Sequence, residues 1–214
     1  EHLTTYELGV KSDWLKQRLR INAALFHSDY EDIQILIFNG IAPETRNAAR
    51  GKITGGELEI SYRPSDKLQL HASLGYLNAR YTELDQSTGA LVNPLNKSDR
   101  FVNTPEWSGH LSVTYQIPLN AHGLLTLYGE YSYRSEIAND AINTEELMQD
   151  SLYLVNGRIA LQSENKQWQI ALYGHNLTDE RYLISGAADK PTFGSVGALF
   201  APPREWGLEI ERRF

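Results

Sequence analysis

The stretch KLQLHASLGY (67–76) alternates strictly between apolar and polar side chains. Its apolar members are Leu68, Leu70, Ala72, Leu74 and Tyr76, and its polar members are Gln69, His71 and Ser73. In an extended chain successive side chains point to opposite faces, so a period of two gathers each set on its own face. The stretch is therefore predicted to be a β-strand with one apolar face and one polar face.

The same period recurs on both sides of this stretch, and helical periodicity is almost absent. The other alternating stretches are 5–14, 18–26, 56–63, 110–117, 125–134, 153–162, 168–176 and 204–214. Alternation of this kind is the main sequence signal of a strand with two different environments. The chain is therefore predicted to be all-β, with about nine strands.

The connections between these strands fall into two classes of length. Four are tight turns rich in Pro, Asn, Ser and Asp: LKQ, RPSD, PLNAHG and SENK. The other four are long, at 36–49, 82–103, 135–150 and 178–202. Long unstructured connections are uncommon in compact soluble domains, whereas outer-membrane barrels have short periplasmic turns and long extracellular loops. The pattern predicts an antiparallel transmembrane β-barrel segment with that layout.

Aromatic residues cluster at the two ends of the predicted strands. Beside the short turns lie Trp14, Tyr62 and Trp168; towards the long connections lie Tyr76, Trp107, Tyr131, Tyr133 and Trp206. Aromatic girdles at both interfaces are typical of a lipid-facing barrel. A soluble β-sandwich or small ligand-binding barrel is the alternative, since it would also alternate. Its loops, however, would not segregate by length.

Composition narrows the function classes. The formal net charge is −7, which argues against a nucleic-acid partner because phosphate binding needs a basic face. The chain has no cysteine, which removes disulfides, thiolate metal sites and cysteine nucleophiles. No stretch approaches the ~20 apolar residues of a membrane helix, and this leaves a strand-built barrel open.

Seven segments follow one another in a fixed order along the chain. They are YELGVKS (6–12), LRINAALFHSDYEDIQ (19–34), GGELEISYRP (55–64), LGYLNARYTE (74–83), NTPEWSGHLSVTYQ (103–116), LYGHNLTDERY (172–182) and APPREWGLEIERRF (201–214). With them the chain resembles, over essentially all of its 214 residues, the C-terminal part of the barrel of a TonB-dependent outer-membrane receptor. The NLTDERY segment and the PPREWGLEI ending are the most specific pieces.

The resemblance implies a bacterial outer-membrane receptor whose 22-stranded barrel encloses an N-terminal plug and imports a scarce nutrient, usually a ferric siderophore. These residues contain no recognisable plug, so 1–214 is expected to be the C-terminal portion of such a barrel, about nine strands of it. The resemblance also implies three partners besides the chelate. The TonB complex would act through the missing plug, the barrel assembly machinery would read the strand ending at Phe214, and outer-membrane lipid would surround the wall.

No catalytic constellation stands out in the sequence. The six histidines show no paired metal-ligand spacing, so neither a metal nor another cofactor is expected. An outer-membrane barrel enzyme is a further alternative, because His175 and Asp179 lie close in sequence, but no nucleophile elbow accompanies them. Gly55 and Gly56 are expected to mark a bulge or a close backbone approach. The Asn-Leu-Thr-Asp run from Asn176 is expected to form an Asx-type strand exit.

The long loops are the expected functional surface. Substrate contacts are predicted, without distinction among them, at Arg46, Arg50, Arg100, Phe193 and Phe200, because arginines attract an anionic chelate and aromatic rings pack on it. The acidic loop 135–150 is interpreted as a solvated segment, bridged by divalent cations to lipopolysaccharide, or alternatively as a substrate or cation contact. The Gly/Ala-rich stretch 184–203 is either a mobile lid or a loop tucked over the rim.

Overall fold

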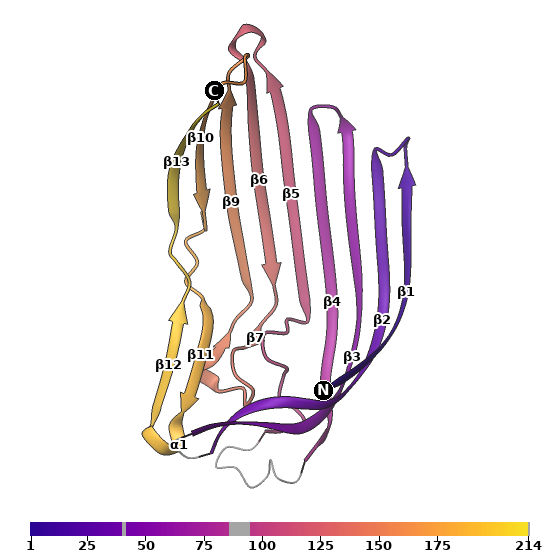
Figure 1. Ribbon diagram of the computed structural model, residues 1–214, viewed down its shortest axis with the longest axis vertical. Coiled ribbons are helices and arrows are strands. Elements are labelled where there is room, and N and C mark those ends of the chain that lie inside the picture. Colours follow the sequence, from indigo (N-terminus) through magenta and orange to yellow (C-terminus); the bar gives the residue numbers. More distant parts are fainter. Residues whose placement is uncertain (40–41, 86–94, 214) are drawn as a thin grey trace.

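The computed structural model describes residues 1–39, 42–85 and 95–213 and consists mainly of one nine-stranded antiparallel sheet (Figure 1). Its strands pair in sequence order, so the sheet is a meander. They are β1 (His2–Trp14), β2 (Leu19–Asn39), β3 (Ala42–Ser65), β4 (Leu68–Leu84), β5 (Trp107–Pro118), β6 (Leu124–Arg134), β9 (Leu152–Gln162), β10 (Trp168–His175) and β13 (Glu205–Arg212). The prediction of about nine antiparallel strands is confirmed.

The tight turns lie together at one end of the sheet, at the top of Figure 1, and the long connections gather at the other end. Several residues of the tight turns have left-handed backbone geometry. Leu15, Lys16 and Gln17 all have positive φ angles in the first turn, of 53°, 57° and 67°. Gly123, which follows the short 3-10 helix η2 (Asn120–His122), has φ 101°, and a Cβ there would lie 1.9 Å from the carbonyl oxygen of Gln162. Only glycine fits that position.

The two faces of the sheet differ as the alternation predicts. Cross-strand register aligns apolar side chains in continuous rows over five strands. One row is Ile117, Leu125, Leu161, Ile170 and Ile210, and the next is Tyr115, Leu127, Ile159, Leu172 and Leu208. These rows are not covered by any other described part of the chain, and Leu208 is 65% exposed. An uncovered apolar surface of this extent is what a lipid-facing wall requires.

The prediction that 36–49 is a long loop is wrong. β2 continues to Asn39 and β3 begins at Ala42, and the two strands pair out to that point. The register slips between Tyr30 and Ile33, where Asp32 takes φ 55°. Such an irregularity moves the following side chains to the other face, so the period of two is lost although backbone pairing goes on.

Two other long connections contain small elements of their own. Segment 135–150 holds β7 (Ile137–Ala138), the 3-10 helix η3 (Glu145–Leu147) and β8 (Met148–Gln149), and β7 pairs with β8. The predicted long connection 178–202 includes most of the stretch 184–203, where the sequence predicts a mobile lid or a loop tucked over the rim. It holds a hairpin of β11 (Leu183–Asp189) and β12 (Ser195–Phe200), with α1 (Lys190–Phe193) at its tip. Both elements lie at the long-connection end (Figure 1).

Of the predicted connection 82–103, residues 86–94 lie outside the described ranges, and β4 extends into its start as far as Leu84. Phe214, the predicted terminal aromatic, also lies outside them. None of the helices in the described ranges is long and apolar enough to cross a membrane.

Candidate functional site

The polar face of the sheet carries a hydrogen-bonded network at its centre. Glu130 on β6 accepts hydrogen bonds from the Tyr128 hydroxyl and from Asn156 Nδ2, the latter at 2.6 Å. Asn156 Oδ1 in turn accepts the backbone N–H of Asn176 at 2.8 Å. Further along the same face Arg158 Nη2 lies 3.2 Å from Glu209 Oε1. These contacts join polar side chains of β6, β9 and β13 and the residue that follows β10, so this face of the sheet is polar and hydrogen-bonded.

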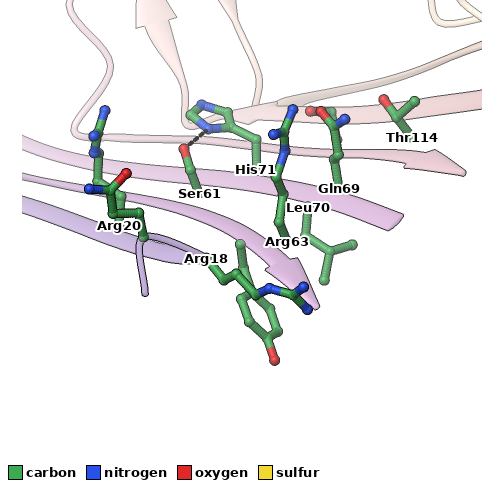
Figure 2. A pocket seen from close by; sticks show the side chains of 11 residues that line it. Arg18, Arg20, Ser61, Arg63, Gln69, Leu70, His71 and Thr114 are labelled. Atoms are coloured by element: carbon green, nitrogen blue, oxygen red, sulfur yellow. Dashed lines mark hydrogen bonds between the residues drawn. The ribbon is translucent and has the colours of Figure 1, made fainter. Parts of the chain in front are cut away.

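A hollow of about 440 Å³ lies on this face near the short turns (Figure 2). In Figure 2 Arg20, Arg63, Gln69, His71 and Thr114 point to one side of the strands, and Arg18 and Leu70 lie on the other. The Ser61 hydroxyl and His71 Nδ1 are 3.1 Å apart. Three arginines line the hollow, and two of them are paired with carboxylates beside it, Arg20 with Asp13 at 2.8 Å and Arg18 with Asp66 at 3.7 Å.

At the opposite end of the sheet, near the long connections, the same face of β2–β4 carries buried apolar side chains. Ile33, Ile35, Ala49, Tyr81 and Leu95 form a buried cluster. The rings of Tyr81 and Phe101 meet with centroids 4.3 Å apart, and Ala141 from the next long connection packs against the cluster. Burial raises the pKa of Tyr81 to about 12, so its phenol stays neutral. Residues from two long connections are thus folded inward against the barrel wall.

Polar contacts fasten these two connections to each other. Asn143 Oδ1 accepts the backbone N–H of Arg100 at 2.7 Å, and Asn143 Nδ2 donates to the Arg100 carbonyl at 3.1 Å. Arg100 Nη2 lies 3.3 Å from Glu136 Oε2. Asn139 Nδ2 donates to the Leu147 carbonyl at 3.0 Å within the second connection. The result is one linked assembly rather than two independent loops.

The β11–β12 hairpin docks on the same assembly. Leu147 is 0% exposed, and a Cβ at Gly186 would lie 2.3 Å from Leu147 Cδ2, so β11 passes in direct contact with that side chain. Lys190 Nζ lies 2.6 Å from Glu146 Oε1. Lys190 lowers the pKa of the exposed Glu146 carboxyl by hydrogen bonding to its charged form. We call the linked segments 95–106, 135–150 and 183–200 the cap.

The five predicted contact residues all lie towards the cap end, but the structure places them differently. Arg100 pairs with Glu136 inside the cap. Arg50 lies 3.5 Å from Glu83 on the outward side of the wall, and Arg46 is half-buried on β3. Phe193 at the hairpin tip is 63% exposed, while Phe200 packs under the Arg181 guanidinium, 4.2 Å from the ring centroid. Their contact with a substrate stays a prediction.

The residues that build the cap were missed by sequence reasoning. Asn139, Thr144 and Leu147 are buried, whereas the sequence predicts a solvated segment or a substrate or cation contact at 135–150. The sequence does contain one signal for this part of the cap: the apolar residues Ile137 and Leu147 stand in an otherwise acidic stretch. Both are at most 1% exposed.

Two local expectations are confirmed. Asn176 closes the exit of β10 with φ 50°, accepting the Glu180 N–H at 2.9 Å and donating to the Glu180 carbonyl at 2.8 Å. Gly55 marks a close approach rather than a bulge, because a Cβ would lie 2.4 Å from the Phe26 ring and the pairing there is regular.

The described residues show neither a metal cluster nor the suggested acid–histidine pair. Within 1–39, 42–85 and 95–213, no three His, Asp or Glu side chains gather where they could hold a metal ion. Asp179 is engaged by Arg204 instead of His175: it accepts the Arg204 N–H at 3.1 Å and lies 3.5 Å from Arg204 Nη2. The ring of His175 lies against Tyr173, with centroids 5.3 Å apart.

Comparison with known proteins gives a consistent result. A family model described as TonB dependent receptor-like, beta-barrel, matches residues 1–177. The chain is 26% identical over 192 residues to an Acinetobacter baumannii protein named Probable TonB-dependent siderophore receptor PiuA, covering 88% of the chain and 24% of that protein. It is 27% identical over 224 residues to the ferric-pyoverdine M114 receptor PbuA of Pseudomonas sp. strain M114, covering 98% of the chain and 24% of the relative.

Among solved structures, the ferric yersiniabactin uptake receptor FyuA from Yersinia pestis superposes with a TM-score of 0.82 at 20% identity. The match covers 99% of this chain and 30% of that receptor. The chain spans about a quarter of the length of the two curated relatives, 24% of each.

Proposed function

Because this chain belongs to the TonB-dependent receptor β-barrel family, matched over residues 1–177, we propose that it forms the C-terminal part of the wall of a receptor that takes up a ferric siderophore. Members of this family lie in the outer membrane of Gram-negative bacteria and act as transport receptors. The nine strands described here supply one sector of such a barrel. The remaining strands and a plug would come from residues outside this chain.

One observation carries the proposal: the sheet is apolar on its outer face and polar on its inner face, with a fastened cap over the inner face at one end. Exposed rows of Leu, Ile and Tyr suit hydrocarbon. The inner network around Glu130 suits water and a polar plug. The cap carries charged and aromatic side chains such as Arg100 and Phe200, and in a receptor it would lie at the outer opening, where a chelate would first be bound.

The cargo is the finer part of the proposal. The names of PiuA, PbuA and FyuA describe receptors for siderophores or their ferric complexes, and this supports the same chemical class here. A ferric chelate that carries negative charge would be attracted by Arg46 and Arg100 and would pack on Phe193 and Phe200. Energy would come from the TonB complex through the plug, and insertion would use the barrel assembly machinery at the last strand.

The test is uptake of radioactive iron by cells that lack their own siderophore receptors and express the receptor carrying this chain. Catecholate, hydroxamate and mixed-ligand ferric siderophores would each be supplied at low concentration. We expect uptake of at least one class, abolished when TonB is deleted. Surface expression with no uptake of any class would contradict siderophore import and direct attention to another cargo.

A matched pair of variants tests the predicted contact surface. Phe193→Ala removes a ring that is 63% exposed at the hairpin tip, and Leu199→Ala removes an apolar side chain that is 58% exposed on the same hairpin. We expect Phe193→Ala to weaken chelate binding by about fivefold to tenfold, corresponding to about 1 kcal/mol for a lost aromatic contact. Leu199→Ala should leave binding unchanged. Equal effects of the two would remove Phe193 from the site.

A further inference from the structure

A hollow of about 410 Å³ lies between the cap and the sheet. The end of β6 and the start of β9 form its wall side, and Asn103 and the start of β11 form its cap side. Ser132 and Arg134 follow Glu130 along β6 at steps of two residues, so their side chains share the polar face of that strand. The hollow therefore belongs to the inner side of the sheet, at the end where the long connections gather (Figure 1).

Arg134 brings to this hollow a positive charge that no carboxylate of the described chain neutralises. The residue is half-buried, and within 1–39, 42–85 and 95–213 its guanidinium makes neither an ion pair nor a hydrogen bond. The carboxylate nearest to it in sequence, that of Glu136, is held by Arg100 at 3.3 Å. Among the described residues no Asp or Glu lines the hollow. The charge is thus open to an anion from outside this chain.

Neutral polar and apolar side chains complete the lining. Ser132, Asn103 and Tyr182 line the hollow, and in the described part of the chain none of their side chains makes a hydrogen bond. Leu152 and Leu154 of β9 lie beside them. Ligand sites typically combine an apolar lining with a few convergent polar groups, and this hollow has that composition.

Hydrogen bonds fix the backbone on both sides of the hollow. Ser135 donates its N–H to the Trp107 carbonyl at 2.8 Å, and its hydroxyl accepts the Trp107 N–H at 3.0 Å. On the cap side the N–H of Leu183 donates to Gln149 Oε1 at 2.8 Å. A site that is formed before its ligand arrives loses less conformational entropy on binding.

We propose that Arg134 binds a free carboxylate of the imported chelate, so that the cargo is a ferric siderophore with a carboxylate arm. A guanidinium can donate two parallel hydrogen bonds to the two oxygens of a carboxylate. The carbon atoms of the arm would pack on Leu152 and Leu154, while the groups that hold the iron stay turned towards the metal. The inference rests on the proposed siderophore import and adds the chemical class of the cargo.

The test measures binding to the detergent-solubilised receptor that carries this chain, by quenching of tryptophan fluorescence. The probes are ferric complexes with a triscatecholate, a trihydroxamate and a mixed catecholate–hydroxamate core, each made with one free carboxylate arm and as its methyl ester. For at least one core the wild type should bind the acid about tenfold more tightly than the ester, the factor expected for a hydrogen bond to a charged group. Arg134→Met should bind the acid only as tightly as the wild type binds the ester. Arg134→Lys keeps the charge without the fork and should retain part of the preference.

Arg80→Met is the matched control. Arg80 donates Nε to Asn78 Oδ1 at 2.8 Å, and in the described ranges it makes no ion pair. It lies at the same end of the sheet, on the outward face that also carries Tyr76. The variant loses the same charge and should keep the wild-type preference for the acid.

Four outcomes would overturn the assignment. Equal affinity of the wild type for acid and ester with every core is the first, and iron uptake by the same receptor would then leave siderophore import standing. The second is an unchanged preference in Arg134→Met. The third is weaker binding of acid and ester alike in Arg134→Met, which would assign Arg134 to a contact with another part of the receptor, such as the plug. The fourth is no binding of any of these complexes together with no iron uptake, which would contradict siderophore import itself.

Discussion

Replacing Leu111 by arginine would place a guanidinium at the centre of the apolar face of β5. Leu111 shares this face with Trp107 and Tyr115, which lie four residues away in opposite directions. Four residues are about 13 Å of strand, or about 10 Å along the membrane normal at a tilt of about 40°. Its cross-strand neighbours are Ala72 and Tyr131, and no described side chain on this face offers it an acidic partner in register.

At that depth an arginine on the lipid face costs about 2–4 kcal/mol, which is about 30-fold to 1,000-fold in the ratio of folded to unfolded receptor. Ile117→Arg lies near the short-turn end of the same strand and should cost only about 0–1 kcal/mol, because the penalty falls off near the interface. Ser112→Arg is the control on the polar face, directly opposite Glu130, and should cost little because water and a carboxylate are at hand.

The assay is guanidinium titration of the receptor refolded into phospholipid vesicles, followed by tryptophan fluorescence. The expected order of destabilisation is Leu111→Arg, then Ile117→Arg, then Ser112→Arg. If Ser112→Arg proved the most damaging of the three, the polar face would be the dry one and the assignment of faces would be refuted. If Leu111→Arg and Ile117→Arg cost the same, the depth argument would fail even though the faces were right.

Three further predictions concern the cap and the strand exit. Leu147→Ala empties a fully buried site and should cost about 2–5 kcal/mol locally, seen as faster hydrogen exchange of segment 135–150 while the main sheet stays protected; unchanged exchange would contradict its role as an anchor. Asn176→Ala loses two hydrogen bonds at φ 50° and should lower stability more than Asn176→Gly, which keeps the backbone geometry; the reverse order in thermal unfolding would contradict the exit. The pKa of Glu146 is lowered by Lys190, so the contact stabilises the cap fully above the ordinary glutamate pKa of about 4.3 and is lost as the pH falls through the lower folded-state value. Distances between spin labels on the hairpin and on η3 should broaden only in that acidic window, and in Lys190→Met at every pH; a pH-independent wild type would contradict the link.

The main sheet could be predicted from the sequence because its information is local and repetitive. Along 67–76 every second side chain is apolar, and Gly123 stands in a short turn where φ is 101° and only glycine fits. Register then follows, since a slip by one residue would turn an apolar row towards water. Nine strands and their order were recoverable on these grounds.

The cap could not be predicted because its contacts join residues far apart in the chain and carry no period. Asn143 fastens Arg100, and Leu147 packs against Gly186. The extension of β2 and β3 was missed for a different reason. Backbone hydrogen bonds continue past the irregularity at Asp32, whereas the side-chain alternation that would announce a strand does not.

The most direct test of the central claim is a spin-label accessibility scan of β5. The chain contains no cysteine, so single cysteines can be introduced at each position from 108 to 117 without another thiol in these residues. In membranes, labels at 109, 111, 113 and 115 should be accessible to oxygen, which concentrates in hydrocarbon, and labels at 108, 110, 112 and 114 to a water-soluble nickel chelate. The two profiles should therefore oscillate with a period of two and in opposite phase. Labels at 109, 111, 113 and 115 that were shielded from both reagents would show a dry protein interior on that face and would contradict the membrane wall.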